Sequence, residues 1–239
     1  MRIAFRKFSC SEFNTTTTTR YINYTYNMGN DPHKKDVPEE SECFPGNVLV
    51  ETKLNGKKCM HNLEVGEEVK VIFEDGNIGF SEVWTMAHKD TESKACYLQI
   101  ETETKRLTIS HFHFIPVTDQ NNSMVVYKMA KDIDIGDHLS TVESNQRKTE
   151  TVIKIEEVEA TGIFAPFTIS GSILVNDVHA SVYAEVEPDF AHSALAPFRE
   201  KYYITPKDEM EAFLRPNENG VPTIFAEAFK MLKQLVPSY

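Results

Sequence analysis

Short stretches of alternating apolar and polar residues recur through the middle of the chain. Residues 69–73 and 153–158 are examples, rich in valine and isoleucine. A period of two is typical of half-buried strands, and turn residues such as Asp75–Asn77 and Asn121–Ser123 punctuate them. The pattern therefore predicts an all-β domain over residues 43–186.

A weak internal repeat lies inside this region. Residues 63–69 (Leu-Glu-Val-Gly-Glu-Glu-Val) are echoed seventy residues later by residues 133–139 (Ile-Asp-Ile-Gly-Asp-His-Leu). Each copy places a glycine turn between an apolar pair and the acidic residue that opens a new strand. Two copies are too few for a solenoid, so we expect two related β-subdomains with pseudo-twofold symmetry.

After Pro188 the apolar spacing becomes helical, which predicts a short helical region over residues 187–239. The last helix is expected over about residues 221–235, with its apolar face packed on the adjacent domain. The first expected helix places four residues on one face: Phe190, Ala194, Leu195 and Phe198.

Residues 1–42 have a different texture. A run of threonines at 15–19 is followed by a charged, proline-bearing stretch at 31–40, which predicts a disordered segment. The basic start, Met1–Lys7, lacks the apolar stretch of a secretory signal. A signal is therefore expected to lie outside this sequence, or the protein works without one.

Composition and charge disfavour nucleic-acid-binding, membrane-spanning and metal-binding proteins. With 239 residues and 41% hydrophobic residues, the chain can form one substantial domain or two small ones. A net charge of −11 disfavours nucleic-acid binding, and no apolar run is long enough to span a membrane. The cysteines show neither zinc-ligand spacing nor a disulfide framework, which leaves at least one thiol free and predicts no metal. They are Cys10, Cys43, Cys59 and Cys96.

Cys43 is the candidate nucleophile, because it opens the apolar, turn-bearing segment Cys43–Gly46 (Cys-Phe-Pro-Gly). Its thiol can attack the preceding carbonyl and convert the Glu42–Cys43 amide to a thioester. Amides are more stable than thioesters, so the step needs a distorted amide, a proton donor and an activated thiol.

The box Thr108–His111 (Thr-Ile-Ser-His) can meet two of these needs. His111 can donate a proton to the leaving nitrogen, and the Thr108 hydroxyl can hold the scissile amide out of planarity. His113 is the rival donor, since it shares a strand face with His111 if the segment is extended. A Thr-x-x-His box alone is frequent, so the order and spacing relative to Cys43 make the site specific.

These two motifs and the run 171–176 (Gly-Ser-Ile-Leu-Val-Asn) together resemble the autoprocessing domain of Hedgehog-type proteins, in the Hint (Hedgehog/intein) superfamily. The resemblance implies an all-β Hint fold with duplicated subdomains and a self-processing cysteine autoprotease. Such a domain acts once, as a monomer without cofactor, on its own N-terminal segment. The disordered segment before Cys43 looks most like that of nematode hog-only or warthog-type relatives.

In that family an acidic residue activates the hydroxyl of an alcohol, which is cholesterol in the best-known members. The activated alcohol then attacks the thioester. The resemblance therefore implies a sterol or other lipid alcohol as co-substrate, with water as the alternative, and secretion of the protein. His88 stands where the family usually has aspartate, but a neutral imidazole can also accept a proton. Asp90 could take this role only if the loop is shifted. The implied catalytic residues are Cys43, Thr108, His111 and His88.

Three positions depart from the pattern of the superfamily. Ala180 occupies the position of the asparagine that cyclises in inteins, so cleavage on one side is expected instead of splicing. Val182 replaces a cysteine and cannot pair with Cys43, and Glu42 replaces a glycine at the scissile position.

Residues 191–199 resemble the segment that opens the sterol-recognition region. The alternatives are a degenerate Hint domain that serves as a secreted binding module, and a cysteine protease that acts in trans.

Overall fold

The computed structural model describes residues 43–118, 125–206, 209–210, 214–215 and 222. The strands are β1 (Leu49–Thr52), β2 (Gly56–Cys59), β3 (Glu68–Ile72), β4 (Ile78–Thr102), β5 (Arg106–Ile109), β6 (Phe114–Thr118), β7 (Val125–Met129), β8 (His138–Glu143), β9 (Gln146–Thr168), β10 (Ser172–Val175) and β11 (Val178–Ser181). The helices are the 3-10 turns η1 (Met60–Asn62) and η2 (Ala130–Asp132), then α1 (Pro188–Ala194) and α2 (Ala196–Ile204). Every strand pairing within these residues is antiparallel, which confirms the predicted all-β class.

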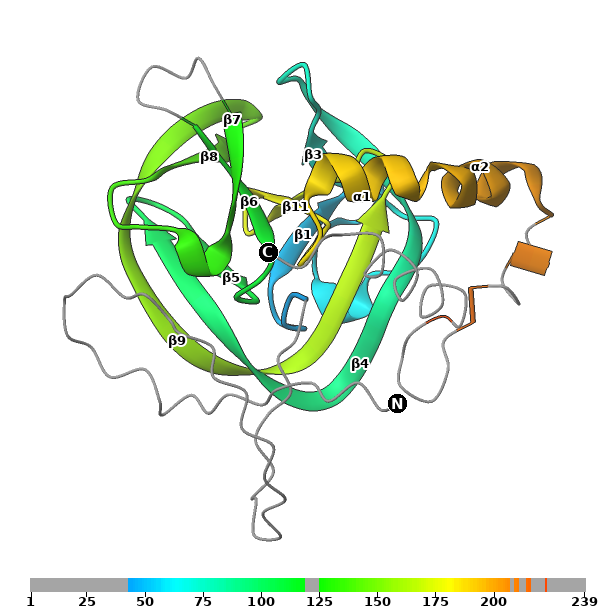
Figure 1. The fold of residues 1–239 in the computed structure, drawn as a ribbon, viewed down its shortest axis with the longest axis horizontal. Coiled ribbons are helices and arrows are strands. Elements are labelled where there is room, and N and C mark those ends of the chain that lie inside the picture. The colour runs from blue at the N-terminus through cyan, green and yellow to red at the C-terminus, as the bar shows by residue number, and fades with distance from the viewer. Residues whose placement is uncertain (1–42, 119–124, 207–208, 211–213, 216–221, 223–239) are drawn as a thin grey trace, which may run out of the picture.

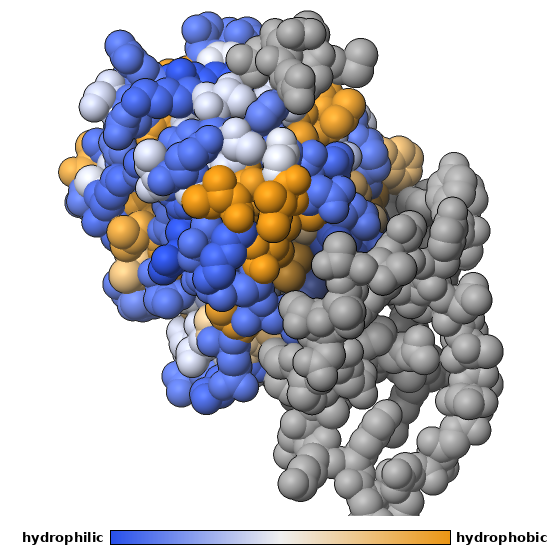
Figure 2. Space-filling view, turned by 90° about the vertical axis from the view of Figure 1, so that its left-hand side faces the viewer, coloured by the Kyte–Doolittle hydropathy of each residue, from blue (hydrophilic) through white to orange (hydrophobic). Residues whose placement is uncertain are grey.

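The two longest strands, β4 and β9, frame the molecule. They pair from Val83 opposite Thr168 to Thr102 opposite Val152, and they curve together around the interior (Figure 1). Irregularities in the pairing, such as the one between Met86 and His88, bend the sheet as β-bulges do. The largest fully buried side chains belong to one hydrophobic core: Trp84, Tyr97, Tyr183, Phe44 and Phe164. Hydrophilic residues surround an apolar patch on the face shown in Figure 2.

The predicted repeat is confirmed in backbone detail. In each copy the glycine N–H donates to a carbonyl of the next long strand, and the N–H of that strand residue donates back to the acidic residue. Gly66 and Glu67 pair in this way with Val83, and Gly136 and Asp137 with Val152. The two glycines have φ of +91° and +101°, a region that favours glycine.

The chain changes from strand to helix at Pro188, as predicted, but the buried helical face is partly different. Ala191 and Leu195 are buried, whereas Phe190 is 45% exposed. Pro197 lies in the first turn of α2. Because proline lacks an N–H and clashes with the preceding turn, one continuous helix cannot form there. Phe198, expected on the same helix as Phe190, therefore lies on α2 and packs there against the core.

Several predictions concern residues outside the described ranges: the disorder of residues 1–42, the turn at 121–123 and the helix over 221–235. The boundary between residues 186 and 187 also stays a prediction. Among the helices that the structure describes, none is long and apolar enough to cross a membrane.

A buried carboxylate joins β9 to its neighbours. Glu150 is 8% exposed and accepts hydrogen bonds from the hydroxyls of Thr102 at 2.5 Å and Thr141 at 3.1 Å. Thr104 donates to it from both its N–H, at 3.1 Å, and its hydroxyl, at 2.7 Å. Burial disfavours the charged carboxylate, but these hydrogen bonds outweigh it and lower the pKa of Glu150.

Glu150→Gln should therefore lower the free energy of unfolding at pH 7 by about 1.5–3 kcal/mol, the range for hydrogen bonds to a charged group. A carboxylate whose folded pKa is lowered stabilises the protein above its unfolded pKa, near 4.5. That contribution is lost as the pH falls through the folded value. Urea unfolding from pH 7 to pH 3 should show a steeper loss in the wild type than in the variant.

Glu200→Gln, on the exposed surface of α2, is the matched control and should retain the wild-type acid response. Equal pH slopes for the wild type and Glu150→Gln would show that the buried carboxylate does not stabilise the fold.

Candidate active site around Cys43

The segment Cys43–Gly46 lies as an added strand against β9. Phe44 exchanges two backbone hydrogen bonds with Phe164, each of 2.9 Å, and the Gly46 N–H donates to the Thr161 carbonyl at 3.0 Å. Pro45 lies between these bonded residues, where no N–H is needed. The pairing therefore fixes the position of Cys43.

Two glycines allow the segment Cys43–Gly46 to lie close to β9. Gly162 has φ of +91°, and a Cβ there would lie 2.6 Å from the Phe164 ring and 3.1 Å from the Gly46 nitrogen. A Cβ on Gly46 would lie 3.0 Å from the same ring. The Tyr97 hydroxyl donates to the Gly162 carbonyl at 2.5 Å and holds the bend from the other side. Any larger residue at 162 would push the segment away from β9.

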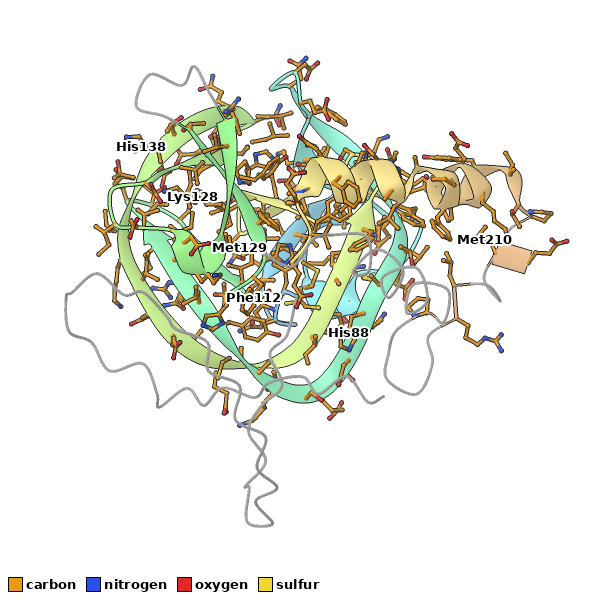
Figure 3. All side chains as sticks on the ribbon, in the orientation of Figure 1. His88, Phe112, Lys128, Met129, His138 and Met210 are labelled. Carbon is orange, nitrogen blue, oxygen red and sulfur yellow. The ribbon has the colours of Figure 1, made fainter. Side chains whose placement is uncertain are left out.

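The structure brings His88 to Cys43. Cys43 is 2% exposed, and its Sγ lies 3.9 Å from Nδ1 of the half-buried His88. His88 pairs with Ala165, while Phe44 pairs with the adjacent Phe164, so β9 aligns the two side chains. Figure 3 labels His88 in the region where β4 and β9 run side by side. At this distance the imidazole can exchange a proton with the thiol.

The Thr-x-x-His box contacts Cys43 through its third residue. The Ser110 N–H donates to the Cys43 carbonyl at 3.1 Å. Thr108 is buried in β5, opposite Gln99 of β4. Nε2 of His111 lies 3.2 Å from Oε1 of Glu157 on β9, and both side chains are about one-fifth exposed.

His113 lies apart from His111, which corrects the expectation of a shared strand face. The chain turns at residues 111–112, so the two side chains diverge. His113 is fully buried, with Nε2 donating to the Ser181 carbonyl at 2.9 Å. Its ring centre is 4.5 Å from that of Phe44. His113 thus packs the Cys-Phe-Pro-Gly segment against β11.

The sequence model of the Hint module family matches residues 33–234, which is most of the chain. The chain belongs to the Hint family. The Sonic hedgehog protein of Danio rerio is 32% identical over 171 residues, 68% of this chain and 41% of that protein. Warthog protein 1 of Caenorhabditis elegans is 31% identical over 148 residues, 61% of this chain and 30% of that protein. The chain thus spans less than half of these relatives.

Solved intein structures share the fold. The DnaB intein from Synechocystis sp. PCC 6803 has a TM-score of 0.50 at 14% identity, covering 60% of this chain and 98% of the intein. A variant of the Ssp DnaB mini-intein has a TM-score of 0.51 at 13% identity, covering 62% of this chain and 96% of that one. These matches confirm the predicted Hint architecture, and the relatives confirm the predicted kinship with Hedgehog-type and warthog-type proteins.

Within this Hint domain, Asp90 is held in its own turn. Its Oδ1 accepts hydrogen bonds from the N–H groups of Glu92 at 2.8 Å and Ser93 at 3.0 Å. The Ser93 hydroxyl contributes most to lowering the pKa of Asp90, although burial opposes it. These hydrogen bonds tie the Asp90 carboxylate to the turn that follows it. Val182 is buried in the core at 1% exposure.

Sequence reasoning did not single out three residues around Cys43. Ser110 lay inside the box but carried no role, and Gly162 was a lone glycine within a strand pattern, which often marks a bend or a close backbone approach. Glu157 sits in an acidic stretch that gave no signal. In the described ranges, no group of three or more His, Cys, Asp or Glu residues is arranged to hold a metal ion.

Gly162→Ala should lower the free energy of unfolding by more than backbone strain alone would. Gly66 is the matched control, because it also has φ of +91° but nothing lies within 4 Å of an added Cβ. Both alanine variants should lose about 1–2 kcal/mol in urea unfolding from left-handed strain. Gly162→Ala should lose more, because its Cβ also overlaps Phe164 and Gly46. Equal losses would contradict the close approach described here.

Proposed function

We propose that this Hint domain cleaves its own chain at the Glu42–Cys43 bond through a thioester. The observation that carries the proposal is the 3.9 Å separation between Cys43 Sγ and His88 Nδ1 at the end of a segment fixed to β9. Kinship with Hedgehog-type proteins and inteins supports autoprocessing in general.

In the first step, His88 accepts the thiol proton and Cys43 Sγ attacks the Glu42 carbonyl carbon. The C–S bond forms and the C–N bond breaks, while His111 donates a proton to the leaving Cys43 nitrogen. The Thr108 hydroxyl holds the scissile amide out of planarity. The Ser110 N–H donates a hydrogen bond to the Cys43 carbonyl. This hydrogen bond restrains Cys43 while the bond between its nitrogen and the Glu42 carbonyl carbon breaks. Proton exchange with solvent then removes the proton from His88 and returns one to His111.

In the second step, a lipid alcohol such as a sterol attacks the thioester, or water does. The C–O bond forms, the C–S bond breaks, and the hydroxyl proton passes to His88 while the sulfur leaves as thiolate. An alcohol with a pKa near about 15 needs such a base, and the His88 imidazole lies beside the sulfur that must leave. The segment before Cys43 is released with the alcohol attached, or as a free acid, and we propose that it is secreted.

Cys43→Ala should abolish cleavage, because the acyl group then has no acceptor. Intact-mass measurement of the purified full chain, with and without dithiothreitol, should show thiol-induced release only when Cys43 is present. His111→Ala should slow release by roughly 100- to 10,000-fold, as is usual when acid–base help is lost. Cys59→Ala, a thiol on β2, is the control and should behave as wild type.

A fragment that begins at residue 43 in Cys43→Ala protein would show that a separate protease cleaves the chain. A wild-type chain that stays intact under thiol would instead favour the alternative, a Hint domain that serves only as a binding module.

The pH dependence of alcohol transfer distinguishes a histidine base from the carboxylate that is usual in the family. An imidazole ordinarily titrates near about pH 6.5 and a carboxylate near about pH 4. Alcohol transfer by the wild type should therefore decline from about pH 7 to 5.5, because the base becomes protonated. Transfer by His88→Asp should persist through this range, and His88→Ala should lose it at every pH. Transfer that survives unchanged in His88→Ala would remove this residue from the mechanism.

A further inference from the structure

Glu157 and His111 meet across three neighbouring strands. Glu157 of β9 pairs with Leu98 of β4, and Leu98 pairs with Ile109 of β5, two residues before His111. The sheet therefore carries the carboxylate and the imidazole to the same place, where they lie 3.2 Å apart. Their exposed fractions of 19% and 20% leave the contact only partly screened by solvent.

This contact determines which ring nitrogen of His111 donates to Glu157. A carboxylate only accepts hydrogen bonds, so Nε2 of the ring must carry the proton that it donates to Glu157. For Nδ1 to donate a proton to the leaving nitrogen, the ring must carry protons on both nitrogens, as an imidazolium. A ring that rotated freely would present either nitrogen and lose alignment with the leaving group.

We propose that Glu157 is the positioning residue that orients His111 for proton donation to the leaving nitrogen. This rests on the proposed thioester chemistry. The neighbouring acidic residues of β9 have other partners: Glu156 pairs with Lys154 at 2.7 Å, and Glu159 pairs with Lys94 at 2.8 Å. Of these three carboxylates, Glu157 is the one directed at the box.

Glu157→Ala should slow thiol-induced cleavage of the full chain by about 10- to 100-fold, the range seen when partners that orient metal-bound histidines are removed. Its thermal midpoint should stay near that of Glu159→Ala, the matched control, which should cleave at the wild-type rate. Glu157→Gln keeps an acceptor oxygen and should recover part of the loss.

A double-mutant cycle tests whether Glu157 acts through His111. In a His111→Ala background, adding Glu157→Ala should slow cleavage no further. Full additivity, or a wild-type rate in Glu157→Ala, would overturn the proposal while leaving the thioester mechanism intact.

Proton NMR of the Cys43→Ala chain gives a readout independent of cleavage. A downfield resonance from the His111 Nε2–H should be present, should disappear in the Cys43→Ala/Glu157→Ala chain, and should persist when Glu159 is replaced instead. If that resonance is absent or unaffected by Glu157→Ala, the ring is not oriented as proposed. If the wild type forms no thioester, the proposed function fails, and this measurement alone decides whether Glu157 holds the ring.

Discussion

The site depends on the backbone pairing between Phe44 and Phe164. That pairing places Cys43 at a fixed register on β9, and the same strand aligns His88 through Ala165. Glu157, on an earlier part of β9, contacts His111. One strand therefore sets the positions of the nucleophile, the nearby base and the proposed positioning residue. The close approach at Gly162 is the structural condition for this arrangement, because a side chain there would separate the segment from β9.

Both duplicated halves contribute residues to the candidate site. Each half has the same turn, with a glycine and an acidic residue bonded to its long strand, and the two long strands then pair with each other. His88 comes from the long strand of the first half and Glu157 from that of the second. Polar contacts also join the halves: the Asn176 side chain accepts from the Leu49 N–H at 2.8 Å and donates to the Arg106 carbonyl at 2.9 Å. Rigidity at the site thus comes from the union of two similar units.

The sequence predicted what local pattern and motif can encode. Alternation revealed the strands and a repeat of seven residues revealed the two halves, because each reflects a periodic burial requirement that every copy must meet. Cys43 was named as the nucleophile and His88 as the base for the alcohol from the resemblance to the family, and the structure places their side chains 3.9 Å apart. The catalytic roles of these residues, of Thr108 and of His111 remain predictions.

Other features depend on contacts that no local pattern records. The turn at residues 111–112 separates His111 from His113, and α1 buries the face with Ala191 and Leu195 while Phe190 stays exposed. Glu157 could not be found because its partner lies forty-six residues away, across two strand pairings. The register of β9, β4 and β5 brings Glu157 to His111, and sequence periodicity does not show that register.

The central claim is that the acyl group of Glu42 moves to the thiol of Cys43. Hydroxylamine tests it most directly, because it converts a thioester to a hydroxamate and marks the carbonyl that was attached to sulfur. Peptide mapping of the treated wild-type chain should find a hydroxamate on Glu42 and a second fragment that begins with Cys43. Hydroxylamine also cleaves Asn–Gly bonds, so hydroxamates at Asn55 and Asn219 are expected in any case. A Glu42–Cys43 bond that stays intact in hydroxylamine would contradict the account.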